Sequence, residues 1–552
     1  MKRILRILVV MAVAGMALLS CQSEKARTSA ALKSFLSEHP YATALADDAP
    51  MLMKLNLGVI YDKSGFAEDP EFAALHEAML EDSDRSERIF IESLIHDLSL
   101  TGIDPAQPIL LSVSGMEIDI DGDDFREEIY VVAPLEDRAK LLTFINMASE
   151  GETTIEPDKD GYYIEIEDNA GVIIAEHAVI AYINTDEDIP APLMRKRLIA
   201  ASEKTSLQAS RPGIREFFEG KDDIACWVDA DAIGAEVRPQ LNKLVKENLG
   251  KSLEEILGGS ITKGVSSFST LNFAGSDVIL HTDVFGTNPL LDRYWSWLGK
   301  TDWDLLRHVP SGAVFAGGIA FDNLSDLLNY AQGVLDRSGQ ADGMNLSAII
   351  AAVGIDPEDL DGVGSLVGGV SISGESFMLA AEAGEGLVEA ARNSLMYAGM
   401  TPLSEDLYEL DDDIRLLLRD DHLFLGSSRL IAAVDKRSAS NFLSDNNLSD
   451  ELTGARGAFV VDLTSEEVYE LLDASSEAEI LCRYLDSAVL RFFNDRSSEL
   501  VLHMQEPGRN SAKSLLLMAA ELMASSSSND WDDIDTDVFF EEDEDFDYDY
   551  LY

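Results

Sequence analysis

One acidic run in the chain is the best candidate for a calcium site. It reads Asp119-Ile-Asp121-Gly-Asp123-Asp124, and calcium needs several oxygens converging on one point. An EF-hand loop places glycine at its sixth position and glutamate at its twelfth, but the twelfth residue here is Tyr130. The pattern favours an acidic turn between two strands. Asp119, Asp121 and Asp123 are kept only as a weak calcium candidate, and no other metal site or cofactor is predicted.

The motifs of hydrolases and nucleotide-binding enzymes yield no catalytic residue. Nucleophilic hydrolysis needs an activated Ser, Thr or Cys, and the chain has no G-x-S-x-G sequence. His76-Glu77 lacks the second His of H-E-x-x-H, and no C-x-x-C pair exists to bind zinc. The Gly-Lys-Ser at 250–252 and the Gly-Lys-Thr at 299–301 lack the first glycine of a P-loop. Because acidic residues are abundant, a carboxylate pair for glycoside hydrolysis stays open as an alternative.

The N-terminus predicts lipid attachment at Cys21. Basic residues at 2, 3 and 6 precede an apolar run over 7–19. This run is shorter than the roughly 20 residues that span a bilayer, and it fits the apolar part of a secretion signal. It ends in Leu18-Leu19-Ser20-Cys21, which resembles a bacterial lipobox, whose cysteine takes a diacylglyceryl group. An ordinary cleaved signal followed by a chance cysteine is the alternative.

A lipobox implies a protein held on the non-cytoplasmic side of a membrane. Lipoproteins of this class usually carry three acyl chains, and two lipid signals already suffice for stable anchoring. The residue after Cys21 is Gln22 and the next is Ser23, with no Asp. By resemblance to known sorting rules, this favours the outer membrane of a bacterial envelope, with the periplasmic or surface face left open.

Charge limits the possible partners. The chain has 42 basic and 101 acidic residues, and removal of the three basic residues of the signal leaves 39 − 101 = −62. This charge repels nucleic acid and anionic lipid surfaces. Beyond the membrane contact through lipid on Cys21, we expect a protein or glycan partner and no nucleic acid. Cys226 and Cys482 lie in apolar runs, which favours free buried thiols over a disulfide.

Two long parts of the chain repeat the same order of elements. Gly-Ile-Asp-Pro occurs at 102–105 and at 354–357, and each copy precedes a strand-like run ending in Ser-Gly. The alignment then pairs His177 with His422, Asp229 with Asp462, and the segment 277–281 with 499–503. This order predicts an internal duplication. Because duplication copies structural positions, His177, His281, His422 and His503 are interpreted as structural residues.

The period-two runs and intervening amphipathic helices predict an α+β fold. We expect two duplicated halves, each a mostly antiparallel sheet with helices packed on one face, and a groove between the halves. The predicted organisation is a signal peptide (1–20), a tether (21–39), a first half (40–297), a second half (303–524) and an acidic, aromatic tail (525–552). The tail contains no Lys or Arg and is predicted to be disordered.

The lipobox, the early DDAPMLMKLNL strand and the Gly-Ile-Asp-Pro turn resemble domain-of-unknown-function family 4836. The resemblance covers roughly residues 40–524 and implies an extracytoplasmic lipoprotein without assigned catalytic residues. We therefore predict a membrane-anchored, non-catalytic binding or scaffold protein. The alternative is a carbohydrate-active hydrolase that uses a carboxylate pair between the halves. A calcium-dependent module at 119–124 is a third hypothesis.

Overall fold

The computed structural model describes most of the chain. The described residues are 27–45, 49–81, 88, 91–92, 95–119, 124–149, 153–158, 161–167, 169–184, 211–310, 312–339, 345–352, 357–371, 376–404, 406–419, 421–436, 448–465, 468–469, 476–493 and 496–526.

The strands of this described part form one 19-stranded sheet in which every pairing is antiparallel. In chain order the strands are β1 (Met51–Leu55), β2 (Ile109–Asp119), β3 (Asp124–Pro134), β4 (Ile155–Asp158), β5 (Gly161–Glu167), β6 (Ala170–Ile174), β7 (Ala178–Asn184), β8 (Ile224–Val228), β9 (Val265–Ala274), β10 (Asp277–Gly286), β11 (Phe315–Ala320), β12 (Ser365–Ser371), β13 (Ser376–Glu382), β14 (Leu407–Asp411), β15 (Ile414–Arg419), β16 (His422–Ser427), β17 (Gly457–Asp462), β18 (Leu485–Phe492) and β19 (Ser497–Met504).

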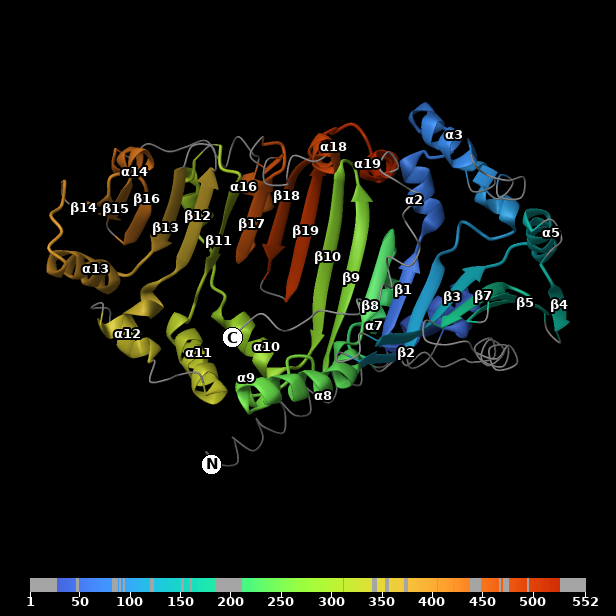
Figure 1. Cartoon of the computed structure of the whole chain (residues 1–552), viewed down its shortest axis with the longest axis horizontal. Coiled ribbons are helices and arrows are strands. Elements are labelled where there is room, and N and C mark those ends of the chain that lie inside the picture. Colours follow the sequence, from blue (N-terminus) through green and yellow to red (C-terminus); the bar gives the residue numbers. More distant parts are fainter. Residues whose placement is uncertain are drawn as a thin grey trace, which may run out of the picture.

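The pairings place the strands in the order β4-β5-β6-β7-β3-β2-β1-β8-β9-β10-β19-β18-β17-β11-β12-β13-β16-β15-β14. The α+β class and the antiparallel sheet are thus confirmed. The two halves do not form separate sheets, because β10 of the first half pairs with β19 of the second. Figure 1 shows the resulting long sheet, with the seam between β10 and β19 near its middle.

Both halves follow the same pairing order. β1 lies between β2 and β8 as β11 lies between β12 and β17, and β3 lies between β2 and β7 as β13 lies between β12 and β16. Asp229 N–H donates to Pro50 O, and Asp462 N–H donates to Val314 O at the matching place. This shared order is consistent with an internal duplication, which stays a prediction.

The alignment of His177 with His422 is one residue out of step with the strand pairing. Leu135 N–H donates to His177 O in the first half, and Ala383 N–H donates to Asp421 O in the second. The residue that corresponds to His177 is therefore Asp421. The sequence alone could not fix this register, because the apolar runs that contain the two histidines differ in length.

The helices are gathered mainly toward the two ends of the strands (Figure 1). Those of the first half are α2 (Leu57–Ser64), α3 (Ala73–Glu81), α5 (Arg138–Ala148), α7 (Ile214–Glu219), α8 (Ala230–Leu249), α9 (Leu253–Leu257) and α10 (Pro289–Trp297), with 3₁₀ turns η1 (Pro40–Ala44), η2 (Pro70–Phe72) and η3 (Leu98–Thr101). Those of the second half are α11 (Leu324–Ser338), α12 (Leu346–Ala352), α13 (Glu385–Tyr397), α14 (Ser428–Asp435), α16 (Leu448–Glu451), α18 (Ser476–Tyr484) and α19 (Ser511–Ser526), with η4 (Trp303–His308) and η5 (Pro357–Gly362).

Side-chain caps explain where several helices begin. Asp137 accepts hydrogen bonds from the N–H groups of residues 139 and 140 at the start of α5. Asp229 caps α8, and Ser252 with Glu255 forms a capping box on α9. Each cap satisfies backbone donors that a helix start leaves without partners.

The two largest apolar cores lie on the same face of the sheet, which we call the core face. The first-half core contains Leu52 and Trp227 and is covered by the helical residues 27–38, η1 and α7. The second-half core contains Val460 and is covered by η4, α14 and α16. The strand register shows that both cores lie on one face. Trp227 lies opposite Phe268 and Val460 lies opposite Val489, and the pairings of β9, β10, β19 and β18 place these side chains on the same side of the sheet.

The opposite face, called here the second face, also contacts helices. α5 packs on it in the first half, α13 packs on it in the second, and α19 packs on it at the seam. Helices therefore cover parts of both faces, whereas the sequence pattern led us to expect one. The reason is visible in β15, where Leu416, Leu417 and Leu418 follow one another and offer apolar side chains to both faces.

Candidate functional site

A row of apolar residues crosses the middle of the second face. Its members are direct register partners on consecutive strands, so their side chains point to the same side of the sheet. From β9 to β16 the row consists of Leu271, Leu280, Leu500, Leu490, Phe459, Gly317, Gly368, Leu379 and Leu425.

Large apolar side chains in and beside this row are open to solvent. They are between 37% and 51% exposed, and we call them the open patch: Leu280, Phe315, Leu366, Val370, Leu379 and Phe459. Five of the six lie on β11, β12, β13 and β17 of the second half. An apolar group of this kind on one sheet face is a candidate interaction surface.

Two glycines lie beneath the most exposed side chains of the open patch. A Cβ atom on Gly317 would lie 2.9 Å from Cδ1 of Phe459, and one on Gly368 would lie 2.5 Å from Cδ2 of Leu379. Phe459 and Leu379 therefore lie across the glycine backbone. Since any larger residue would push them outward, the glycines allow these side chains to lie low on the sheet.

The core face at the seam is polar, in contrast to the open patch. Asp277 lies opposite His503, and His281 lies opposite Glu499. The two contacts between a histidine ring and a carboxylate are reciprocal: Nδ1 of His503 lies 3.0 Å from Asp277, and Nδ1 of His281 lies 3.6 Å from Glu499. The segments 277–281 and 499–503, which the sequence alignment pairs, thus meet across the seam.

His503 joins three elements. Its Nε2 lies 3.1 Å from a carboxylate oxygen of Glu451 on α16, while its Nδ1 faces Asp277 on β10. The hydrogen bond to Glu451, supported by Asp277, raises the pKa of His503 to about 9 despite the opposing effect of burial. The same bond lowers the pKa of Glu451. The arrangement stabilises a charged imidazolium that holds the halves together.

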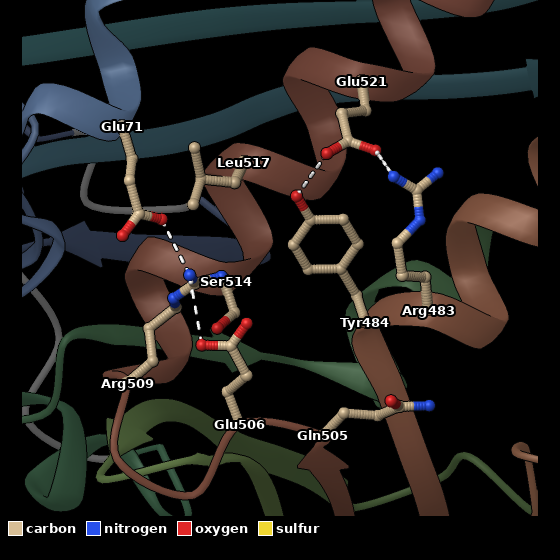
Figure 2. A pocket seen from close by; sticks show the side chains of 9 residues that line it. All are labelled: Glu71, Arg483, Tyr484, Gln505, Glu506, Arg509, Ser514, Leu517 and Glu521. Atoms are coloured by element: carbon tan, nitrogen blue, oxygen red, sulfur yellow. Dashed lines mark hydrogen bonds and ion pairs between the residues drawn. The ribbon is translucent and has the colours of Figure 1, made fainter.

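A pocket of about 360 Å³ lies where the two halves meet at the C-terminal helix. Figure 2 shows its lining, which we call the polar pocket: Glu71, Arg483, Tyr484, Gln505, Glu506, Arg509, Ser514, Leu517 and Glu521. Glu71 comes from η2 in the first half, and the others come from α18, α19 and the chain between β19 and α19. This is the region of the described structure that best matches the groove expected between the halves.

Ion pairs tie one side of the polar pocket together. Arg509 lies between Glu71 at 2.7 Å and Glu506 at 3.1 Å, as Figure 2 shows. Lys513, next to the pocket, reaches Glu71 at 3.0 Å and also pairs with Asp69. These contacts connect α19 and the loop before it to the first half.

The other side of the pocket is organised around Glu521. Glu521 accepts a hydrogen bond of 2.7 Å from the Tyr484 hydroxyl and pairs with Arg483 at 2.8 Å (Figure 2). Burial and the bond to Glu521 raise the pKa of Tyr484 to about 12. All three pocket carboxylates thus pair with cations, and this geometry favours holding helices together over transferring a proton to a substrate.

Of the four residues that the sequence singled out as site residues, the structure describes only Asp119. Cys21 and the tail beyond Ser526 lie outside the described residues, as do Asp121 and Asp123. Asp119 ends β2 and lies opposite Asp124 on β3, which agrees with an acidic hairpin turn. Within the described parts of the chain, no three His, Cys, Asp or Glu residues are placed to hold a metal ion.

The two remaining cysteines are free thiols and are half-buried. Burial raises the pKa of Cys226 to about 11, so its thiolate is disfavoured at neutral pH. None of the helices that the structure describes is long and apolar enough to cross a membrane. Residues 525 and 526, assigned to the tail from the sequence, belong to the end of α19.

Sequence reasoning missed the open patch. Its strands looked like ordinary core strands, because apolar alternation does not say which face is covered. One signal was present: the paired glycines at 317–318 and 368–369 lie in adjacent strands. Glycine in a strand interior often marks a place where another surface approaches closely.

Comparison with known proteins adds little. No protein-family model matches the chain, and no curated protein matches it either. Among solved structures, crystal form I of TP0453 has a TM-score of 0.24 and 9% identity, over 46% of this chain and 82% of that one. Crystal form IV of TP0453 has a TM-score of 0.24 and 10% identity, over 44% and 78%. Similarity at this level supports no inference about function.

Proposed function

We propose that the chain is a lipid-anchored, extracytoplasmic binding protein whose open patch takes a protein partner. The anchor rests on the lipobox-like Leu18-Leu19-Ser20-Cys21 sequence. Resemblance to domain-of-unknown-function family 4836 and duplication of one ancestral half belong to the same proposal. The shared strand order of the two halves supports the duplication.

The open patch is the observation that carries the binding function. Its exposed groups are hydrocarbon and phenyl side chains, so it gains free energy by excluding water. Sugar hydroxyls buried against such a surface would lose their hydrogen bonds, and a protein partner therefore fits better than a glycan. Because the chain has 101 acidic and 42 basic residues, the partner needs an apolar surface with a neutral or basic rim.

The polar pocket does not favour the hydrolase alternative. A glycosidase needs one carboxyl group that gives a proton and another that acts as nucleophile or base. Here Glu71, Glu506 and Glu521 each pair with a guanidinium group. We propose no hydrolytic activity.

Localisation is tested first. We expect the chain in the membrane fraction, and Cys21→Ser should release it to the soluble extracytoplasmic fraction. Protease treatment of intact cells, with periplasmic proteins as controls, then distinguishes the two faces of the envelope. Retention of the Cys21→Ser variant in the membrane would contradict lipid anchoring at this residue.

Binding is tested by placing a photo-crosslinking phenylalanine analogue at Phe459. We expect one discrete adduct with a different protein, and Leu379→Asp should abolish it by placing a charge in the same open patch. The matched control is the analogue at Tyr397, which is 93% exposed at the end of α13. Equal adducts at both positions, no adduct at Phe459, or an adduct only with a second copy of the chain would overturn the proposed partner.

A further inference from the structure

A second apolar site lies beneath α8, away from the open patch. The cavity measures about 330 Å³ and lies between α8, α9 and the segment 259–262. Its volume is within the range of roughly 300–1,000 Å³ that is typical of small-ligand sites. Residues of the open patch do not line it.

One face of α8 supplies most of the apolar wall. Ile233, Val237 and Leu241 recur every four residues and so project from the same side of the helix. Leu253 and Leu257 of α9 form the facing wall. All five are only half-buried, because the two helices leave space between them that no side chain fills.

Contacts at one end hold α8 at a fixed position. Gly234 lies so close to Thr262 that a Cβ atom would come within 2.2 Å of its hydroxyl oxygen. Arg238 donates to Gly234 O at 2.7 Å and to Ser260 Oγ at 3.0 Å, and it pairs with Asp231 at 3.1 Å. These bonds make the cavity part of the folded structure.

Several of the polar groups at the cavity are already engaged. The guanidinium of Arg238 has the three partners just described, and Oδ1 of Asn242 accepts from the Glu254 N–H. A ligand with many polar groups would find few partners for them there. The walls favour an occupant whose buried part is hydrocarbon.

We infer that the α8–α9 cavity binds an alkyl chain. A fatty acid in solution and the acyl chain of a membrane lipid supply the same chemistry. This inference concerns a different site from the open patch and goes beyond the proposed function.

The test uses the mature chain with Cys21→Ser, so that no attached lipid competes. N-phenyl-1-naphthylamine is the fluorescent probe, and decanoate is the competitor. We expect saturable binding at one site, displacement by decanoate, and at least a tenfold loss of probe affinity in Val237→Trp, which fills the cavity. If Val237→Trp lowers the melting temperature, Leu253→Phe on α9 is used as the second cavity-filling variant.

Two variants serve as controls. Leu244→Trp adds the same ring on α8 at a residue that is exposed and outside the cavity lining, and Phe459→Ser alters the open patch. Both should bind the probe as the parent chain does. Absence of saturable binding, unchanged affinity in both cavity-filling variants, or loss of binding in Phe459→Ser would overturn the inference. Displacement by phosphatidylethanolamine vesicles assigns the alkyl chain to a membrane lipid, and displacement by decanoate alone assigns it to a free fatty acid.

Discussion

Cys226 and Phe459 hold matching positions in the two halves, because Asp229 and Asp462 three residues later make the same backbone hydrogen bond. Both lie on the second face, yet Cys226 is half-buried and Phe459 is 51% exposed. The strand partner of Cys226 is Met53, whereas that of Phe459 is Gly317.

The difference extends across the neighbouring strands. Met53 lies opposite Leu111, while Gly317 lies opposite Gly368. Strand pairing is a backbone property and follows the same order in both halves, but the side chains of one face differ. A shared backbone frame thus permits one half to keep a partly covered face while the other exposes an apolar surface.

The largest expected effect comes from removing one aromatic side chain from each half, one in the first-half core and one in the open patch. Trp227 is fully buried in the first-half core and donates from its indole nitrogen to Pro212 O at 2.9 Å. Trp227→Ala should cost about 3–5 kcal/mol of unfolding free energy, whereas Phe459→Ala should cost less than about 1 kcal/mol. Urea unfolding of both variants measures this. Similar costs would show that Phe459 is part of a core and that the open patch is wrongly described.

The sequence predicted local structure better than long-range assembly. Asp137 and the residues after it predict α5 because a cap and an apolar period are local signals. Joining of the halves through β10 and β19 was missed, since edge pairing depends on residues more than 200 positions apart. The polar pocket was missed for the same reason: Glu71 and Arg509 are 438 residues apart.

The seam gives a pH-dependent test of how the halves are held together. The pKa of His503 is about 9 in the folded chain, against an ordinary value of 6.5. Its contribution, up to about 3 kcal/mol, is therefore complete below pH 6.5 and is lost as pH rises through 9. His503→Gln should be less stable than the parent chain at pH 6, and the difference should shrink toward pH 9.5.

Thermal unfolding between pH 6 and 9.5 measures this difference. His177→Gln is the control, because the His177 side chain is 73% exposed, and its profile should run parallel to that of the parent chain. A difference for His503→Gln that does not depend on pH would contradict a charged imidazolium at the seam.

The contribution of His308, in the second half, to stability should change with pH in the opposite direction. Burial, together with the nearby charges of Arg307, His422 and Arg419, lowers its pKa to about 4. The stabilisation of the neutral ring is present above pH 6.5 and is lost as pH falls toward 4. His308→Leu should therefore reduce the acid sensitivity of unfolding between pH 6.5 and 4, as followed by the urea midpoint. An unchanged acid profile would place the sensitivity in other groups.

The smallest expected effect is the difference in unfolding free energy between the variants that remove the Asp229 and Asp462 side chains. Asp229 accepts from the Ala232 N–H at 3.1 Å and starts the 20-residue helix α8. Asp462 accepts from the N–H and hydroxyl of Thr464, at 2.9 and 2.6 Å, within a turn. Asp229→Ala should cost about 1–2 kcal/mol, and Asp462→Ala less than about 1 kcal/mol.

Asn can cap a helix as Asp does, so Asp229→Asn and Asp462→Asn separate loss of the cap from loss of charge. Both Asn variants should stay near the parent chain in urea unfolding. If Asp229→Ala and Asp462→Ala instead cost the same, the side-chain cap on α8 would contribute no more to stability than the side-chain bonds of Asp462 within its turn, since both variants keep the backbone bonds to Pro50 O and Val314 O. The stability of the shared strand frame would then not depend on which half carries the long helix α8.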